Sequence, residues 1–379
     1  NAAADRGTQA TFSWDDVEYS VLYMPFWGTI EFNTDGQVEI GSGGIGAEWN
    51  SGELVEIVLD DNDMNLDARN QEQMTIASNT TIVPAVKIGS PITLKTLDTL
   101  THFLPTASVS TTVDENINDT QCSSDYGAAG TAASYVSCYE KYSERAVLTN
   151  SGSAITLADE DQLQFVYDGT TVGDLKDMIS NANGTAAYTY IQYDFRSFNG
   201  GGNDSNYYLN FTIGDSTLNS GTCVTDATTY TNGHCTESRF AEGLIGRVLI
   251  NSPGDTLKGL GDTATSALTD AEALRINVEL NSISGNALGD SLSAGTSYPI
   301  TMDIVTFGQS NDGVTAGDRH NNSIYRLEVD EVDANGGIFV GELDFIMLNQ
   351  LNVNQTSTYN DTKTDHEENR IIVHNDLTD

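Results

Sequence analysis

Basic residues are scarce in this sequence. It has 16 lysines and arginines against 55 aspartates and glutamates, which gives its 379 residues a formal net charge of -39. Such an excess of acid repels nucleic acid phosphates and anionic lipid head groups, so we expect no nucleic acid partner. It attracts cations, both bound divalent ions and a diffuse cloud of small monovalent ones. Acidity that serves only solubility or salt adaptation is the alternative to a specific cation-handling role.

Long apolar runs are also missing. No run approaches the ~18–20 residues that a helix needs to span a bilayer, so we expect no membrane span in this segment. The chain begins at Asn1, with neither a methionine nor a signal-peptide pattern. We therefore expect any signal or anchor to lie outside it.

Patterns typical of catalytic sites are absent. The five histidines are scattered and form no HExxH motif, and the sequence has no GxSxG elbow. Carboxylates are so numerous that any pair could be chosen for glycoside hydrolysis, and no pair is therefore informative. We expect the chain not to be an enzyme, and a secreted glycoside hydrolase is only the third-ranked function.

Cysteine is rare, and its four copies fall into two close pairs. Cys122 precedes Cys138 and Cys223 precedes Cys235, and neither pair has the CxxC spacing or histidine neighbours of a zinc site. An even number in a polar chain indicates two local disulfides and an oxidising compartment, with four free thiols as the alternative. Eight N-x-S/T sequons suit a glycosylated surface protein. They begin at Asn79, Asn118, Asn183, Asn203, Asn210, Asn321, Asn354 and Asn360.

The composition and the periodicity favour β-structure. Hydrophobic residues make up only 38% of the chain, and turn-forming polar residues and glycine fill the gap. Strands are predicted at 29–32, 38–40, 53–59, 163–168, 188–195, 207–213, 244–250, 274–280, 304–307, 324–329 and 341–348, two short strands around Gly89 within 83–94, and a helix at 172–179. Residues 105–150 are predicted to be rich in loops. The architecture implied is a set of antiparallel β-sandwich modules.

An acidic run directly after the strand at 53–59 is the strongest chemical cluster. It places oxygen-bearing side chains at alternate positions, and such hard, anionic donors suit Ca²⁺. The candidate metal ligands are Asp61, Asp63, Asn65 and Asp67. Glu72 falls at the twelfth position from Asp61, but Leu66 stands where an EF-hand requires glycine. We therefore predict a structural Ca²⁺ site outside the EF-hand class, with a solvated acidic loop as the alternative.

Two stretches carry a family resemblance. Residues 53–67 (ELVEIVLDDNDMNLD) join a strand to the acidic run. Residues 324–348 (IYRLEVDEVDANGGIFVGELDFIML) contain an acidic strand, a turn with asparagine and the run GIFVG. In this order they resemble the Ig-like modules of surface-layer (S-layer) proteins from ammonia-oxidising archaea (Nitrososphaerota, or Thaumarchaeota). A simple module holds both motifs within about 100 residues, whereas here more than 250 residues, from 67 to 324, lie between them.

The resemblance implies a domain organisation. Residues 29–95 together with 300–350 would form one discontinuous Ig-like β-sandwich, and 96–299 would be a β-rich insertion that carries both cysteine pairs. Residues 1–28 would be the end of a preceding module or a linking strand, and 351–379 a linking strand or the start of the next module. Two or three sequential sandwiches are the alternative.

The resemblance also implies a function. The chain would be a structural segment of a glycosylated coat at the outer cell surface, formed by self-association into a two-dimensional lattice and stabilised by Ca²⁺ at the acidic run. Its acidic surface would attract and sieve small cations. The second candidate is an extracellular adhesin or carbohydrate-binding module, in which Trp14, Trp27 and Trp49 could line a sugar-binding cleft.

Overall fold

The computed structural model of this chain is β-rich, with several antiparallel sheets and one short α-helix. The structure describes residues 9–14, 17–22, 29–33, 54–65, 67–77, 83–104, 107–114, 135–140, 143–150, 155–156, 161–180, 186–199, 207–213, 239–251, 270–271, 273–282, 291–293, 296–309, 319–347 and 369–373. No helix among these residues is long and apolar enough to cross a membrane.

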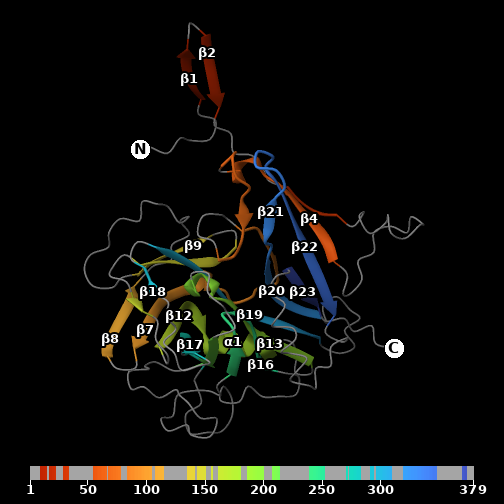
Figure 1. Cartoon of the computed structure of the whole chain (residues 1–379). Helices are drawn as coiled ribbons and strands as arrows, with labels where there is room; N and C mark the ends of the chain where they lie inside the picture. The colour runs from red at the N-terminus through yellow and green to blue at the C-terminus, as the bar shows by residue number, and fades with distance from the viewer. Residues whose placement is uncertain are drawn as a thin grey trace, which may run out of the picture.

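The larger part of the molecule contains two antiparallel sheets (Figure 1). The seven-stranded sheet contains β6 (Ala85–Ile88), β9 (Tyr135–Glu140), β10 (Arg145–Asn150), β13 (Ala186–Asp194), β16 (Ile245–Asn251), β19 (Ser297–Gln309) and β20 (Arg319–Arg326). The six-stranded sheet contains β7 (Leu97–Leu104), β8 (Ala107–Asp114), β12 (Asp161–Thr171), β14 (Tyr207–Ile213), β15 (Arg239–Glu242) and β17 (Ala273–Ser282). Their orders are β16-β13-β19-β10-β9, with β20 beside β19 and β6 beside β20, and β15-β14-β17-β12-β7-β8.

One hydrophobic core joins these two sheets into a sandwich. Strands place alternate residues on one face, and both sheets turn such a row towards the same buried cluster. From β17 and β19 the row consists of Leu274, Ile276, Val278, Leu280, Ile300, Met302 and Ile304, each at most 1% exposed. The helix α1 (Val172–Ser180) adds Val172 and Leu175 to this core. Thr171 caps the helix, because its Oγ1 accepts the Asp174 N–H at 3.1 Å.

A third sheet unites strands from both ends of the chain. It contains β3 (Thr29–Asn33), β4 (Leu54–Asp60), β5 (Gln73–Met74), β21 (Val329–Glu331), β22 (Ile338–Met347) and β23 (Asn369–Val373). The order is β3-β4-β22-β21-β5, and β23 runs parallel beside β22. Antiparallel pairing of β4 with β22 extends from Asp60↔Ile338 to Leu54↔Asp344. The two family-like motifs are therefore neighbours in space, as Figure 1 shows in orange and blue.

The third sheet has a small core of its own. It consists of Ile57, Leu59, Met74, Leu327, Val329 and Phe339. Within the range 300–350, β19 and β20 belong to the sandwich, whereas β21 and β22 belong to the third sheet. The strand predicted at 324–329 is divided between them, because β20 ends at Arg326 and β21 begins at Val329. Leu327 lies in between and donates its N–H to the Pro84 carbonyl at 2.8 Å.

Two further predictions of secondary structure were wrong. The range 105–150 was predicted to be rich in loops, but its described residues lie mostly in β8, β9 and β10, whose threonine, valine and tyrosine residues favour strands despite the polar composition. The second short strand predicted after Gly89 is a lone bridge between Ile92 and Ile304, followed by a 3-10 turn at Leu94–Thr96. Pro91 precedes that bridge, and a proline has no N–H to donate to a ladder.

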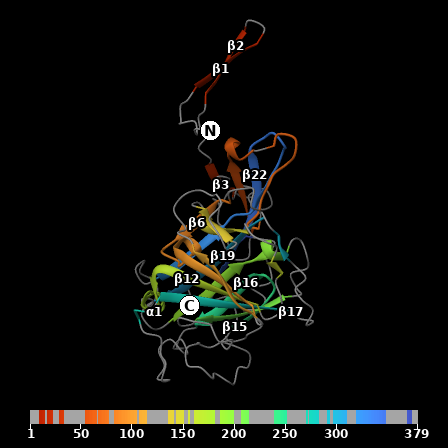
Figure 2. The same ribbon diagram turned by 90° about the vertical axis from the view of Figure 1, so that its left-hand side faces the viewer.

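Two short sheets remain. The pair β11 (Ile155–Thr156) and β18 (Ser291–Leu292) forms one of them. The hairpin of β1 (Gln9–Trp14) and β2 (Val17–Leu22) forms the other. This hairpin lies apart from the sandwich and the third sheet in both views (Figures 1 and 2).

A buried ion pair stabilises the sandwich at the end of β20. The guanidinium of Arg326 contacts both carboxylate oxygens of Asp303 on β19, and Nη2 donates to Oδ1 at 3.0 Å. Its Nε donates to the Ser143 carbonyl at 2.6 Å, so the turn before β10 is held as well. Burial raises the pKa of Asp303, and Arg326 offsets only part of that rise. The pair is therefore costly to break from either side.

Replacing Arg326 tests this arrangement. Arg326→Met leaves the fully buried Asp303 without its counter-ion. We expect the free energy of unfolding in urea to fall by about 3–5 kcal/mol. The control is Lys176→Met, which removes the exposed 2.7 Å ion pair with Asp270 and should cost less than about 1 kcal/mol. Equal losses in the free energy of unfolding for the two variants would contradict the interpretation that the buried pair of Arg326 and Asp303 is costly to break.

Candidate functional site

The acidic run lies against the turn that joins β21 to β22. We call residues 61–72, of which Leu66 is not described, the β4–β5 loop, and residues 332–337 the β21–β22 turn. The Asp61 N–H donates to the Gly337 carbonyl at 2.8 Å. Gln71 Nε2 donates to the Val332 carbonyl at 2.7 Å across 261 residues of sequence. The two family-like motifs thus form one corner of the third sheet.

The glycines of the GIFVG run explain how closely these segments approach. Gly337 has a φ of 61°, a left-handed conformation that glycine adopts without strain. A Cβ there would lie 2.6 Å from Asn62 Oδ1, closer than the two atoms' van der Waals radii allow. A Cβ on Gly341 would lie 2.5 Å from the Glu328 carbonyl oxygen. Both positions therefore exclude larger residues for steric reasons.

Glu331 is the buried carboxylate at the centre of this corner. It is only 3% exposed. Its Oε2 accepts the Glu72 N–H and its Oε1 accepts the Gly337 N–H, both at 3.2 Å. The backbone N–H of Glu331 also donates to the Glu72 carbonyl at 2.8 Å. One side chain thus joins the β4–β5 loop to the β21–β22 turn.

The pKa of Glu331 reflects two opposing causes. Burial raises the pKa, because it removes water from the charged form. Hydrogen bonds from the Glu72 carboxyl group and from the N–H groups of Glu72, Gly337 and Gly336 outweigh burial and lower the pKa below its ordinary value. The ionised state of Glu331 is therefore part of what holds this corner together.

The predicted calcium ligands lie along the β4–β5 loop. Asp61 is half-buried directly after β4, and Asp63 lies in the 3-10 turn Asn62–Met64, with its side chain outside the described part of the chain. Asn65 Oδ1 is buried and accepts no hydrogen bond from the described residues. Such an orphan oxygen fits a cation ligand. Asp67 is exposed and has another task.

Asp67 caps a tight turn of the loop. Its Oδ1 accepts the Arg69 N–H at 3.1 Å, and its Oδ2 accepts Asn70 Nδ2 at 2.7 Å. Its own N–H donates to Glu72 Oε1. Binding of an ion by Asp67 would compete with this turn. Among the described side chains, no group of three or more His, Cys, Asp or Glu is placed to hold a metal, so the Ca²⁺ site stays a prediction.

Sequence reasoning gave Glu331 no role. The signal for it was an acidic residue at the same alternation phase as Val329, which faces the small core. Glu72 was noticed only for its spacing from Asp61, whereas the structure shows that it contacts Glu331. Hydrogen bonds across more than 250 residues have no signature in a local pattern.

Most of the other predicted sites lie outside the described residues. These are Cys122, Cys223, Cys235, Asn79, Asn118, Asn183, Asn203, Asn354, Asn360, Trp27 and Trp49. Cys138 lies in β9, paired in register with Val147. The sequon residues Asn210 and Asn321 lie in β14 and β20, and Trp14 lies in β1. The disulfides and the glycans therefore stay predictions.

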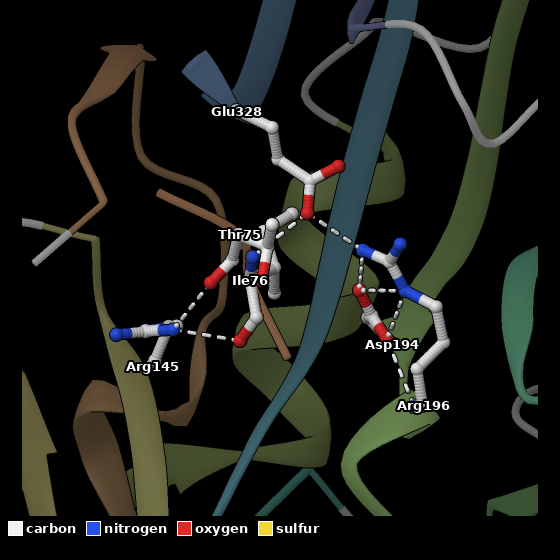
Figure 3. Close-up of polar contacts among 6 residues, drawn as sticks. All are labelled: Thr75, Ile76, Arg145, Asp194, Arg196 and Glu328. Atoms are coloured by element: carbon white, nitrogen blue, oxygen red, sulfur yellow. Dashed lines mark hydrogen bonds and ion pairs between the residues drawn. The ribbon is translucent and has the colours of Figure 1, made fainter. Parts of the chain in front are cut away.

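A polar seam anchors the corner to the sandwich (Figure 3). From β10, the 2%-exposed Arg145 donates its Nη1 to the carbonyls of Thr75 and Ile76, at 3.2 and 2.6 Å. Those two residues follow β5, so the guanidinium caps the end of this short strand. The first part of the seam is therefore an arginine of the sandwich that donates to backbone carbonyls directly after strand β5 of the third sheet.

Glu328 carries the second half of the seam. Its Oε1 accepts the Ile76 N–H at 2.7 Å and Arg196 Nη2 at 2.8 Å. The guanidinium of Arg196 also binds Asp194 at the end of β13, where Nη2 donates to Oδ2 at 2.7 Å. Burial alone would lower the pKa of Arg196, but the two carboxylates outweigh it and raise the pKa. Arg196 is therefore a permanent cation between the two parts of the molecule.

Glu331→Gln tests the corner. At pH 7 we expect a loss of about 1.5–3 kcal/mol in the free energy of unfolding, because charge-assisted hydrogen bonds are replaced by neutral ones. The folded-state pKa is lowered, so this stabilisation exists above the ordinary pKa of about 4.3 and is lost as the pH falls through the folded value. The difference between variant and wild type should therefore shrink in acid. Asp330→Asn, on the exposed face of the same strand, is the control and should change stability by less than about 0.5 kcal/mol.

Arg196→Met tests the seam by hydrogen exchange. We expect faster amide exchange at 71–77 and 327–333, because these residues lose their anchor, and little change in β17 and α1. Arg69→Met is the control, since Arg69 is exposed on the loop. Uniform acceleration over the whole chain would show that the seam is not a local anchor.

Comparison with known proteins adds no relative. The chain matches no protein-family model, and no curated protein matches its sequence.

Proposed function

We propose that this chain is a structural segment of a cell-surface S-layer lattice, stabilised by Ca²⁺ and with an acidic surface that attracts and sieves cations. The observation that carries the proposal is the antiparallel pairing of β4 with β22. It joins the two stretches that resemble Ig-like modules of archaeal S-layer proteins. The resemblance therefore applies to one three-dimensional unit, with its own small core and its own closing turn.

The charge distribution supports the cation-handling part of the proposal. Of only 16 basic residues, Arg145 and Arg326 are at most 5% exposed and Arg196 is also largely buried. Arg196 and Arg326 pair with carboxylates inside the molecule and Arg145 donates to backbone carbonyls, so none of the three balances carboxylates on the outer surface. Such a surface raises the local concentration of small cations. The enrichment extends over a Debye length, about 8 Å at physiological ionic strength.

Calcium would act as a structural ion at the β4–β5 loop. Asp61, Asp63 and Asn65 would hold it, with Asn65 offering a buried oxygen that accepts no hydrogen bond from the described residues. Ca²⁺ takes six to eight oxygen ligands and would supply a rigid cross-link between loop residues. The loop is attached to the β21–β22 turn through Glu331, so ordering the loop would stiffen the whole corner.

Assembly in the presence of Ca²⁺ tests the function. We expect added CaCl₂ to drive the purified chain into sheets visible by negative-stain electron microscopy, and a chelator to disperse them. Divalent cations are needed because copies with a charge of -39 repel one another. Protein that stays monodisperse at high concentration with Ca²⁺, by light scattering, would overturn the proposal.

A separate measurement tests the ion site. Asp61→Asn together with Asp63→Asn should weaken Ca²⁺ binding in calorimetry by at least about tenfold and abolish the rise in melting temperature that Ca²⁺ gives the wild type. The matched control is Asp330→Asn with Glu342→Gln, which removes the same charge from the exposed outer side of the third sheet. If both double variants lose Ca²⁺ equally, the effect is one of net charge, and no site exists at the loop.

A further inference from the structure

The β21–β22 turn contains a chemically labile pair of residues. Asn335 is followed by Gly336, and asparagine is a thermolabile residue that can lose its side-chain amide without an enzyme. In that reaction the backbone nitrogen of the next residue bonds to the asparagine Cγ, and ammonia leaves with the nitrogen's proton. Water then opens the resulting cyclic imide at either of its carbonyls. The product is aspartate or isoaspartate, and isoaspartate has one more methylene group in its backbone.

The turn leaves this pair accessible to the reaction. Asparagine precedes glycine at 183, 199, 232 and 335, and only the pair at 335 lies wholly within the described residues. Asn335 is exposed there, so water reaches its side chain. Gly336 has no side chain that would crowd the cyclic imide. Asn335 therefore meets the chemical requirements for deamidation.

Hydrogen bonds of the folded turn oppose the first step. The Gly336 nitrogen can attack only when its proton leaves, and this N–H donates to the Asp333 carbonyl at 2.8 Å. The same N–H also donates to the carboxylate of Glu331. A proton held by a carboxylate is harder to remove, because its loss would place two negative charges side by side. The exposed carboxylate of Asp333 adds to the negative charge of the turn.

The turn must therefore open before the ring can form. Opening breaks the bond from the Val332 N–H to the Ile338 carbonyl, at 2.9 Å, and the bond from the Gly337 N–H to Glu331 Oε1, at 3.2 Å. Local openings of this kind occur in native proteins with a free energy below that of global unfolding. When opening and closing are fast, a slow reaction of the open form proceeds in proportion to the open population.

We propose that Asn335 is a site of spontaneous deamidation, and that opening of the corner around Glu331 sets its rate in the folded protein. This inference does not depend on the proposed function. Isoaspartate at 335 would lengthen the backbone just before Gly337, whose N–H binds Glu331 and whose carbonyl accepts the Asp61 N–H. Gly337 already lies against Asn62 with no room for a Cβ. The modification would therefore loosen the same corner whose opening permits it.

Mass spectrometry of aged protein tests the site. The chain is incubated in ¹⁸O water and digested, and fragment ions locate the incorporated oxygen and distinguish isoaspartate from aspartate. We expect deamidation at Asn335 to be at least tenfold slower in the folded chain than in the same chain in urea. Equal rates in the two conditions would show that the turn gives no protection, and that result overturns the proposal.

Glu331→Gln tests the control by the corner. It should speed deamidation at Asn335 at least tenfold, because a tenfold larger open population corresponds to about 1.4 kcal/mol, less than the stability loss expected above. Asp330→Asn removes the same charge from the exposed face of the strand and should leave the rate unchanged. If Glu331→Gln deamidates at the wild-type rate, or Asp330→Asn is accelerated as much, the corner does not set the rate.

A second variant excludes global unfolding as the cause. Arg196→Met loosens the corner from the seam, without touching the turn, and should also speed the reaction. Amide exchange in β17, measured on the same samples, should stay slow in both variants, which shows that the sandwich remains folded. Acceleration that occurs only when β17 also exchanges faster would mean that global unfolding controls the rate, and it would overturn the proposal.

Gly336→Ala is the chemical control. A Cβ there would lie 3.3 Å from the Asp333 carbonyl oxygen, and the residue has no left-handed φ, so a small shift accommodates alanine. The added methyl group crowds the cyclic imide, and we expect deamidation in urea to fall at least tenfold. An unchanged rate in urea would show that oxygen enters at 335 by a route other than the imide, contrary to the proposal.

Discussion

Buried arginines hold the two parts of this molecule together. Arg145 and Arg196 reach from the sandwich to the carbonyls after β5 and to Glu328, and Arg326 holds Asp303 and the turn before β10. A guanidinium suits this task, because it stays charged when buried and presents several donors in one plane. A lysine in these places would donate to fewer groups. Placing cations inside and carboxylates outside is thus one solution to folding so acidic a chain.

The third sheet depends on that seam more than the sandwich does. Its core has six buried side chains, whereas the sandwich core has a far longer set. Its central strands, β4 and β22, come from opposite ends of the chain. They can pair only after folding has brought these distant segments together, which costs entropy and slows their pairing. Hydrogen bonds from Arg145 and Glu328 fix the end of the two-residue strand β5, which could not stay paired by itself. Loss of the seam would therefore open the corner before the sandwich.

Local patterns predicted most strands but little of how they combine. The strands at β4, β12, β14, β16 and β17, and the helix α1, follow from alternation and helical spacing, which act over a few residues. The division of 324–329 between two sheets could not be read from the sequence, since both halves have strand character. Glu331 escaped notice because its partners, Glu72 and Gly337, include one more than 250 residues away. The resemblance of two distant motifs was the one long-range signal, and it pointed to strands that do pair.

Under the proposed function, the division of charge also limits which surfaces of the chain can meet another copy. An outer surface rich in carboxylates resists contact with itself, so association must use either cations or the few uncharged faces. On the outer side of the third sheet, Val332 and Ile338 are exposed beside the carboxylates of Asp60, Asp330 and Glu342. Screening ions would lower the repulsion between such carboxylates on neighbouring copies. Acidity and assembly are then compatible, because the same cations that the surface attracts permit the copies to approach.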